Sequence, residues 1–374
     1  MSESKLNVKL LEELSNEFGP SGHERDVQKI ALKYGKQYAD SVEFDRTGSV
    51  IFKKGTSGPK IMLAGHADEI GFVICGIEKK GYLRISNLGG WWAHSILSQQ
   101  ILIRTMEGKK YTGIIIAPPP HVLPAEMRNK VVPLEKMFVD VGCKSDKEVK
   151  ELGIQMGDPA VPIATFRIET RKRINKKDDK KTKEVQLAFG KAFDDRVGVF
   201  IILEVLRRLK EENIEHPNTV YCASTTQEEV GLRGARTAAQ LIKPDIGFSL
   251  DVDISGDAPG VQGISQKMGN GVSISAGDGS MIPNPLFRKH VIDVAEKHNI
   301  KWQPAFLRRG GTDAGIIHVT GIGAPSLFLG IPTRHIHSHN GIMSLQDVEN
   351  SINLLVEVLK TLDEKTVDSF TKLE

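Results

Sequence analysis

Strand-like and helix-like segments alternate through the second half of this 374-residue chain. Short apolar segments at 219–225, 246–253 and 324–332 predict strands. Helical periodicity predicts helices that lie between and around them, at 195–210, 234–242, 285–298 and 344–362. This alternation predicts an α/β fold with a mostly parallel sheet and helices on both faces. Ligands in such sheets bind beyond the carboxyl ends of the strands.

The first 70 residues are expected to belong to the same domain. A helix is predicted over 5–18, and Ser21 with Glu24 is expected to form a capping box at the start of a second helix. Strands are then predicted at 41–44, 49–52 and 60–65. The last of them is short and apolar, as buried strands are, and runs directly into His66.

The segment 71–164 has a different character, since it contains short β-rich stretches with little helical periodicity. It predicts a small β-barrel or sandwich inserted into the main domain, which residues 1–70 and 165–374 would form. The prolines at 118–120 are expected in a loop, because proline cannot sit inside a sheet. The basic stretch 171–184 predicts a solvated hairpin tip between strands at 165–169 and 185–190, with a functional basic patch as the alternative.

Charge and cysteine content narrow the class of protein. The chain has 50 basic and 47 acidic residues, a net charge of +3, which gives no reason to expect nucleic acid or a membrane surface as a partner. No secretory signal is expected, because the first residues show no basic stretch followed by an apolar core, and the longest apolar runs are too short to span a bilayer. The three cysteines are widely spaced without a CxxC motif, so a cytoplasmic protein without disulfides is expected.

Side chains that can bind metal fall after predicted strands or at helix starts. Each group alone has an ordinary explanation, such as helix capping for paired aspartates or a solvated face for paired glutamates. Their convergence on one sheet edge is what a divalent ion such as Zn²⁺, Co²⁺ or Mn²⁺ requires. The groups are His66-Ala67-Asp68-Glu69, Asp194-Asp195, Glu228-Glu229, Asp251 with Asp253, and His335 with His337 and His339.

In order along the chain, these groups and their surroundings resemble the M42 family of metallo-aminopeptidases, which includes tetrahedral, glutamyl and deblocking aminopeptidases. The resemblance spans nearly the whole chain. The matching stretches are FGPSGHE (18–24), AGHADEIGF (64–72), PPPH (118–121), FVDVG (138–142), ELGIQMGD (151–158), AFDDRVG (192–198), QEEVGLRGA (227–235), DVDISGDAPG (251–260), GTDAG (311–315) and PTRHIHS (332–338).

The resemblance implies a site for two divalent ions per subunit, Zn²⁺ or Co²⁺. It implies that His66 and Asp251 bind one ion, that Glu229 and His337 bind the other, and that Asp194 bridges both. It also implies a cis peptide bond after Asp194. On an extended segment, His335 and His339 would share a face with His337, but the family pattern uses only the middle histidine.

Two further roles follow from the resemblance. Glu228 is implied to be the general base and acid, which activates a metal-bridged water and then protonates the leaving amine. Asp68 is implied to orient His66 from behind. The residues alone do not separate the base from the ligand within Glu228-Glu229.

The family likeness also implies an assembly and a substrate. Peptides with free N-termini are the implied substrates, and a PDZ-like insert over 71–164 is implied to form dimers, which build a homododecamer. The alternatives are a glycoside hydrolase, for which an aromatic content of 6% is low, and a non-catalytic relative. A non-catalytic relative would be expected to have lost part of the ligand set or Glu228, whereas this chain has all of these residues.

Overall fold

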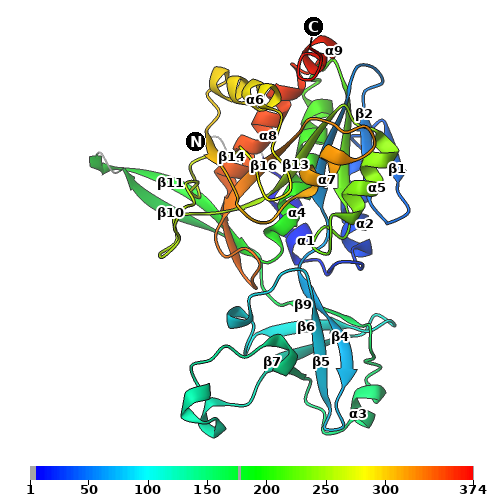
Figure 1. The fold of residues 1–374 in the computed structure, drawn as a ribbon, viewed down its shortest axis with the longest axis vertical. Helices are drawn as coiled ribbons and strands as arrows, with labels where there is room; N and C mark the ends of the chain where they lie inside the picture. The colour runs from blue at the N-terminus through cyan, green and yellow to red at the C-terminus, as the bar shows by residue number, and fades with distance from the viewer. Residues whose placement is uncertain (1–5, 176–177, 374) are drawn as a thin grey trace.

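The computed structural model describes residues 6–175 and 178–373. In Figure 1 the described chain forms a sheet covered by helices, a separate β-barrel at one end, and a long hairpin that projects to one side. The α/β fold with an inserted barrel, expected from the sequence, is confirmed.

The main sheet contains eight of the described strands, in the order β1-β2-β12-β3-β13-β16-β14-β15. Its four central strands run parallel: β12 (Thr219–Thr225), β3 (Lys60–His66), β13 (Ile246–Ile254) and β16 (Ser326–Thr333). Outer strands join antiparallel at both sides: β1 (Ser41–Phe44), β2 (Val50–Lys54) and β14 (Val272–Ser275), with β15 (Trp302–Ala305) parallel to β14. The four parallel strands therefore end at a common edge.

Helices cover both faces of this sheet. On β3, Leu63 lies in the hydrophobic cluster on one face, and its neighbour Met62 lies in the cluster on the other, as strand alternation requires. The larger cluster includes α1 (Val8–Asn16), α2 (Arg25–Gly35), α4 (Phe193–Glu211), α6 (Pro285–Lys297), α8 (Leu345–Leu359) and α9 (Glu364–Asp368). The smaller includes α5 (Arg233–Ile242) and α7 (Asp313–Val319). None of the helices that the structure describes combines the length and apolar character needed to span a bilayer.

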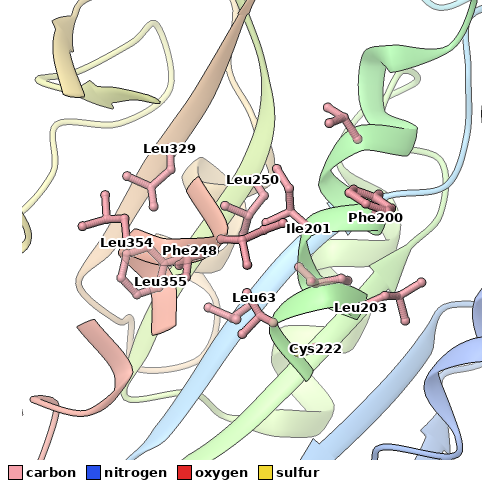
Figure 2. Close-up of a cluster of buried hydrophobic side chains, with 14 of the residues drawn as sticks. Leu63, Phe200, Ile201, Leu203, Cys222, Phe248, Leu250, Leu329, Leu354 and Leu355 are labelled. Atoms are coloured by element: carbon pink, nitrogen blue, oxygen red, sulfur yellow. The ribbon is translucent and has the colours of Figure 1, made fainter. Parts of the chain in front are cut away.

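The core between α4, α8 and the sheet is closely packed. Figure 2 shows Leu63 and Cys222 of the sheet, Ile201 of α4, and Leu354 and Leu355 of α8 in one buried hydrophobic cluster. All five side chains are fully buried. Helix α4 is therefore fixed on the sheet, and its first turn is held at the edge where the parallel strands end.

Removing one methyl group from this core is expected to lower stability measurably. Ile201 is 0% exposed, so Ile201→Val should lower the free energy of unfolding by about 0.5–1.5 kcal/mol. The matched control is Ile322→Val in an exposed turn, where the same methyl group is in water and the change should be below about 0.5 kcal/mol. Urea unfolding measures both, and equal losses in the two variants would contradict the prediction.

The barrel closes in the order β4-β5-β8-β7-β6-β9 and has its own hydrophobic core. Its strands are β4 (Gly71–Ile77), β5 (Tyr82–Leu88), β6 (Gln100–Arg104), β7 (Lys110–Ile116), β8 (Phe138–Asp140) and β9 (Pro159–Pro162), with helix α3 (Asp146–Glu151) and short 3₁₀ turns at Ala93–Ser95 (η1), Pro120–Val122 (η2), Ala125–Met127 (η3) and Leu134–Lys136 (η4). The three prolines lie in the connection after β7, as expected. Of the two architectures predicted from the sequence, the barrel is the one observed.

The basic segment is not a loop tip along its whole length, and this part of the prediction is wrong. β10 (Arg167–Asn175) pairs with β11 (Asp178–Gly190) far into the basic stretch, as in the pair Ile174↔Thr182, and β11 also pairs with β17 (Gly341–Ser344). The two strands form the arm that projects in Figure 1. Cross-strand hydrogen bonds override the low strand propensity of lysine here. Residues 176–177, within the expected tip, lie outside the described residues.

The second helix begins later than predicted. α2 starts at Arg25, and Glu24 in front of it makes no side-chain capping bond. The Ser21 hydroxyl instead donates to Asp68, 47 positions away. The Ser21 hydroxyl therefore bonds to the distant carboxylate of Asp68 and not to the start of the helix.

Candidate metal centre

The side chains predicted from the sequence lie together at the carboxyl edge of the parallel strands. β3 ends in His66, and β13 carries Asp251 near its end. Parallel strands deliver these residues to one edge, beside the first turn of α4. The residues brought together are His66, Asp194, Glu228, Glu229, Asp251 and His337.

Asp194 lies between the two histidines. Its Oδ1 is 3.1 Å from His66 Nε2, and its Oδ2 is 3.1 Å from His337 Nε2. Each histidine has a further carboxylate of its own. Asp251 Oδ2 lies 3.9 Å from His66 Nε2, and Glu229 Oε2 lies 3.7 Å from His337 Nε2. The arrangement is two histidine–carboxylate pairs that share one central carboxylate.

Asp195 also lies in the cluster, although the family resemblance implies no ligand role for it. The ligand atoms of His66, Asp195 and Asp251 fall within 4.8 Å of one another, as do those of His66, Asp194 and Glu229. The Asp195 carboxylate, however, accepts hydrogen bonds from the backbone N–H groups of His66 at 2.9 Å and Gly198 at 2.8 Å. These two hydrogen bonds tie the end of β3 to the start of α4. The Asp194–Asp195 peptide bond is cis, as the resemblance implies.

Asp68 supports two parts of the site at once. Its Oδ1 lies 3.3 Å from His66 Nδ1 and accepts from the backbone N–H of Glu228 at 3.0 Å. Its Oδ2 accepts from the Ser21 hydroxyl at 2.6 Å and from the backbone N–H of Glu229 at 3.2 Å. Asp68 therefore positions both the imidazole and the backbone that carries the two glutamates. Its predicted role was limited to His66.

Two further buried carboxylates adjoin the cluster. Glu24 accepts from the backbone N–H of Gln227 at 3.0 Å, and burial raises its pKa to about 7. Asp313 accepts from the Thr225 hydroxyl at 2.6 Å, and burial raises its pKa to about 6. The other oxygen of Asp313 has no hydrogen-bond partner within the described part of the chain. Both residues lie in stretches that carry the family resemblance. These contacts could not be predicted, because the partners are far away in the sequence.

The electrostatics of the cluster fit divalent cations. Burial raises the pKa of Glu228 and Asp251 well above the ordinary range, and burial with nearby Asp194 raises that of Glu229 to about 8. Burial also opposes ionisation of Asp194, but hydrogen bonds from both histidines hold its pKa below the ordinary value. Glu229 Oε1 is buried with no partner among the described residues. Crowded buried carboxylates need positive charge, and mixed carboxylate–imidazole donors suit Zn²⁺, Co²⁺ or Mn²⁺.

The three histidines after β16 do not share a face, so the extended segment considered above is wrong. His335 and His337 both have positive φ angles, 62° and 51°, which turn the chain. His335 is exposed, whereas His339 is buried against the barrel, with its ring centroid 5.2 Å from that of Trp91. Of the three, His337 faces Asp194.

The chain is similar to known aminopeptidases over almost its whole length. The model of the family described as M42 glutamyl aminopeptidase matches residues 48–354. The lysyl aminopeptidase of Pyrococcus furiosus is 31% identical over 365 residues, which cover 96% of this chain and 99% of that protein. A solved TET aminopeptidase from a marine sediment archaeon of the Thaumarchaeota is 46% identical with a TM-score of 0.90, covering 97% and 99% of the two chains. The TET1 peptidase of Pyrococcus horikoshii, described as assembling into a tetrahedron or a large octahedral shell, is 28% identical with a TM-score of 0.79, covering 94% and 98%.

Proposed function

Because this chain belongs to the M42 glutamyl aminopeptidase family, we propose that it is a metal-dependent aminopeptidase that hydrolyses N-terminal residues from peptides. Aminopeptidase activity is the function that the family and the names of its relatives support. Members of this family depend on metal, and the chain carries acidic and imidazole groups that could hold it. The observation that carries the proposal is the Asp194 carboxylate, which lies 3.1 Å from an imidazole on each side.

We assign His66 and Asp251 to one ion and Glu229 and His337 to the other, with Asp194 between them. Zn²⁺ and Co²⁺ both suit this donor set. Three protein groups per ion leave room for water and substrate, which distinguishes a catalytic from a structural site. When bound, the two ions would acidify the attacking water and polarise the scissile carbonyl.

Glu228 is the residue that we assign to proton transfer. Its Oε2 lies 3.9 Å from His66 Nε2, and its side chain is only 10% exposed, so it is inside the cluster. An ionised Glu228 takes a proton from the attacking water and passes it to the leaving amine, a transfer that needs a carboxylate within hydrogen-bond reach. Asp68 fixes the backbone of Glu228 at 3.0 Å and thereby sets where its carboxylate lies.

The histidines argue against a glycoside hydrolase. That mechanism needs two carboxylates on either side of a sugar and no imidazole. Here two imidazoles lie against a shared carboxylate within 3.1 Å. The intact cluster, with Glu228 beside it, also argues against a non-catalytic relative.

Similar structures support a large homo-oligomeric assembly. TET1 structures are described as a dodecamer and as a tetrahedron or octahedral shell. We propose the division into a catalytic domain, 1–70 and 165–374, and an oligomerisation insert, 71–164. Dimers made through the insert would build a homododecamer. We propose a cytoplasmic location because the three cysteines are widely spaced and have no CxxC motif. Light scattering that finds only monomer would overturn the assembly.

Release of aminoacyl p-nitroanilides by the purified protein tests the function. Activity should fall to background when EDTA removes the metal and should return when Zn²⁺ or Co²⁺ is added back. N-acetylated versions of the same substrates are the matched control and should not be cleaved, because an aminopeptidase requires a free N-terminus. Activity that survives full metal removal, or cleavage of p-nitrophenyl glycosides instead, would overturn the proposal.

A further inference from the structure

A loop of the barrel reaches the candidate metal centre. We call residues 89–91, which follow β5, the Gly89–Trp91 segment. The Gly90 carbonyl oxygen lies 2.7 Å from His337 Nδ1. A carbonyl oxygen only accepts, so Nδ1 carries the proton and donates it. In the neutral imidazole that binds a metal, the lone pair is then on Nε2, the nitrogen that faces Asp194.

The backbone of this segment comes closer than a side chain would permit. A Cβ atom on Gly90 would lie 3.0 Å from His337 Nδ1 and 3.3 Å from its Cε1. A Cβ atom on Gly89 would lie 2.6 Å from Ile70 Cγ2 and 2.8 Å from Glu229 Oε2. Gly89 also has a φ of +78°, which side chains rarely adopt. The barrel therefore touches both residues that we assign to the second ion.

The segment is anchored on both sides. The indole of Trp91 stacks on Phe72 of the barrel at 4.8 Å between ring centroids and donates to the Gly71 carbonyl oxygen at 3.0 Å. Its ring also packs at 5.2 Å against His339, two residues beyond His337. Both ring nitrogens of His339 are buried and have no partner among the residues described. The Trp91–His339 contact is therefore a packing contact without a hydrogen bond, and it holds the His337 loop against the barrel.

The other half of the site is held differently. His66 is fixed by the Asp68 carboxylate and by its own backbone N–H, which donates to Asp195. Asp251 lies on β13 within the main sheet, and its carboxylate accepts from the backbone N–H of Val252 at 2.6 Å. These supports come from the sheet, the connection after β3 and the first turn of α4. Asp68 also holds the backbone of Glu229, so the two ion positions differ in the barrel contacts to Glu229 and His337.

From this asymmetry we infer that the Gly89–Trp91 segment is a positioning element for Glu229 and His337. It makes the ion at those residues depend on the barrel, whereas the ion at His66 and Asp251 does not. The inference rests on the proposed function, because it takes these four residues as ligands. It assigns the insert a second role, in the chemistry of the site as well as in assembly.

Metal titration of the apoprotein with a competing chelator tests the inference without measuring activity. The wild type should bind two Zn²⁺ ions. Gly90→Ala and Gly89→Ala should keep one ion at unchanged affinity and bind the other about 10- to 100-fold more weakly. The control is Gly108→Ala in the β6–β7 turn, where φ is +85° but no atom lies within 4 Å of the added Cβ. It carries a backbone strain like that of Gly89→Ala and should bind both ions normally.

A second pair of variants separates positioning from folding. Trp91→Leu removes the contact with His339, and Trp92→Leu, at a neighbouring side chain that is 67% exposed, is its control. With Co²⁺ bound, Trp91→Leu should change the visible absorption of one of the two ions, and Trp92→Leu should match the wild type. Two tight ions in Gly90→Ala, or equal weakening of both, would overturn the inference and leave the proposed function standing. A wild type that binds no metal would overturn both.

Discussion

Glu228→Gln is expected to slow the release of N-terminal residues by about 10²- to 10⁴-fold, the usual contribution of a general acid–base. Glutamine keeps the size of the side chain but cannot accept a proton from water. The backbone of Glu228 should stay where Asp68 holds it, because that hydrogen bond uses the main-chain N–H. The variant should therefore fold normally and bind two metal ions. Steady-state kinetics on an aminoacyl p-nitroanilide, with metal content measured on the same sample, check the result.

The neighbouring variant Glu229→Gln is the matched control. Glu229 Oε2 lies 3.7 Å from His337 Nε2, on the other side of Asp194 from His66. We expect this variant to lose affinity for one ion as well as activity, because an amide is a weaker ligand than a carboxylate. The sequence alone does not say which of the two glutamates is the base and which is the metal ligand, and the metal content of the two variants separates these roles. Loss of metal in Glu228→Gln with normal metal in Glu229→Gln would show that the two roles are reversed.

The second large effect is expected on stability, at Glu69. Its carboxylate accepts from Lys191 Nζ at 2.6 Å and lies 3.3 Å from an Arg196 guanidinium nitrogen, and all three side chains are at least 95% buried. Glu69→Ala would leave two buried cations without their counter-ion. We expect it to lower the free energy of unfolding by about 3–5 kcal/mol. Urea unfolding of the metal-free protein, at fixed protein concentration, measures this loss.

An exposed ion pair is the control for Glu69. Glu78 pairs with Arg84 on the barrel surface, where both side chains are more than a third exposed. Glu78→Ala should change the free energy of unfolding by less than about 1 kcal/mol, because solvent screens such pairs. Similar losses in the two variants would contradict the view that burial makes the Glu69 pair important. Arg196 also donates to the carbonyl oxygens of Leu14 and Gly19, so the network joins the N-terminal segment to α4.

The fold could be predicted where a pattern repeats locally. Strand β3 was predicted because its apolar run is short and ends at His66, and α4 was predicted from its periodic apolar face. The extent of β10 and β11 could not be predicted, because lysines and arginines have little strand propensity and only the pairing of the two strands keeps them extended.

In the candidate site, too, some residues could be predicted from local sequence and others could not. Residue type and position after a strand identified His66, Glu228 and Asp251 as a group. Their supports could not be predicted, because each is a hydrogen bond between distant parts of the chain. Ser21 reaches Asp68 across 47 positions, and His337 reaches Gly90 across 247. A glycine also gives no sign in the sequence that its carbonyl oxygen is the functional group.

The insertion of the barrel between β3 and the strands that pair with it bears on how the chain folds during synthesis. Every barrel strand lies between residues 71 and 162, so the barrel can close as soon as this segment has left the ribosome. β3 must wait for both neighbours, since its partners β12 and β13 begin at Thr219 and Ile246. Until then the backbone N–H and C=O groups along both of its edges are open to pairing with other chains. The nascent protein is therefore expected to carry a closed barrel beside an unpaired strand that ends in His66, one of the residues proposed to bind metal.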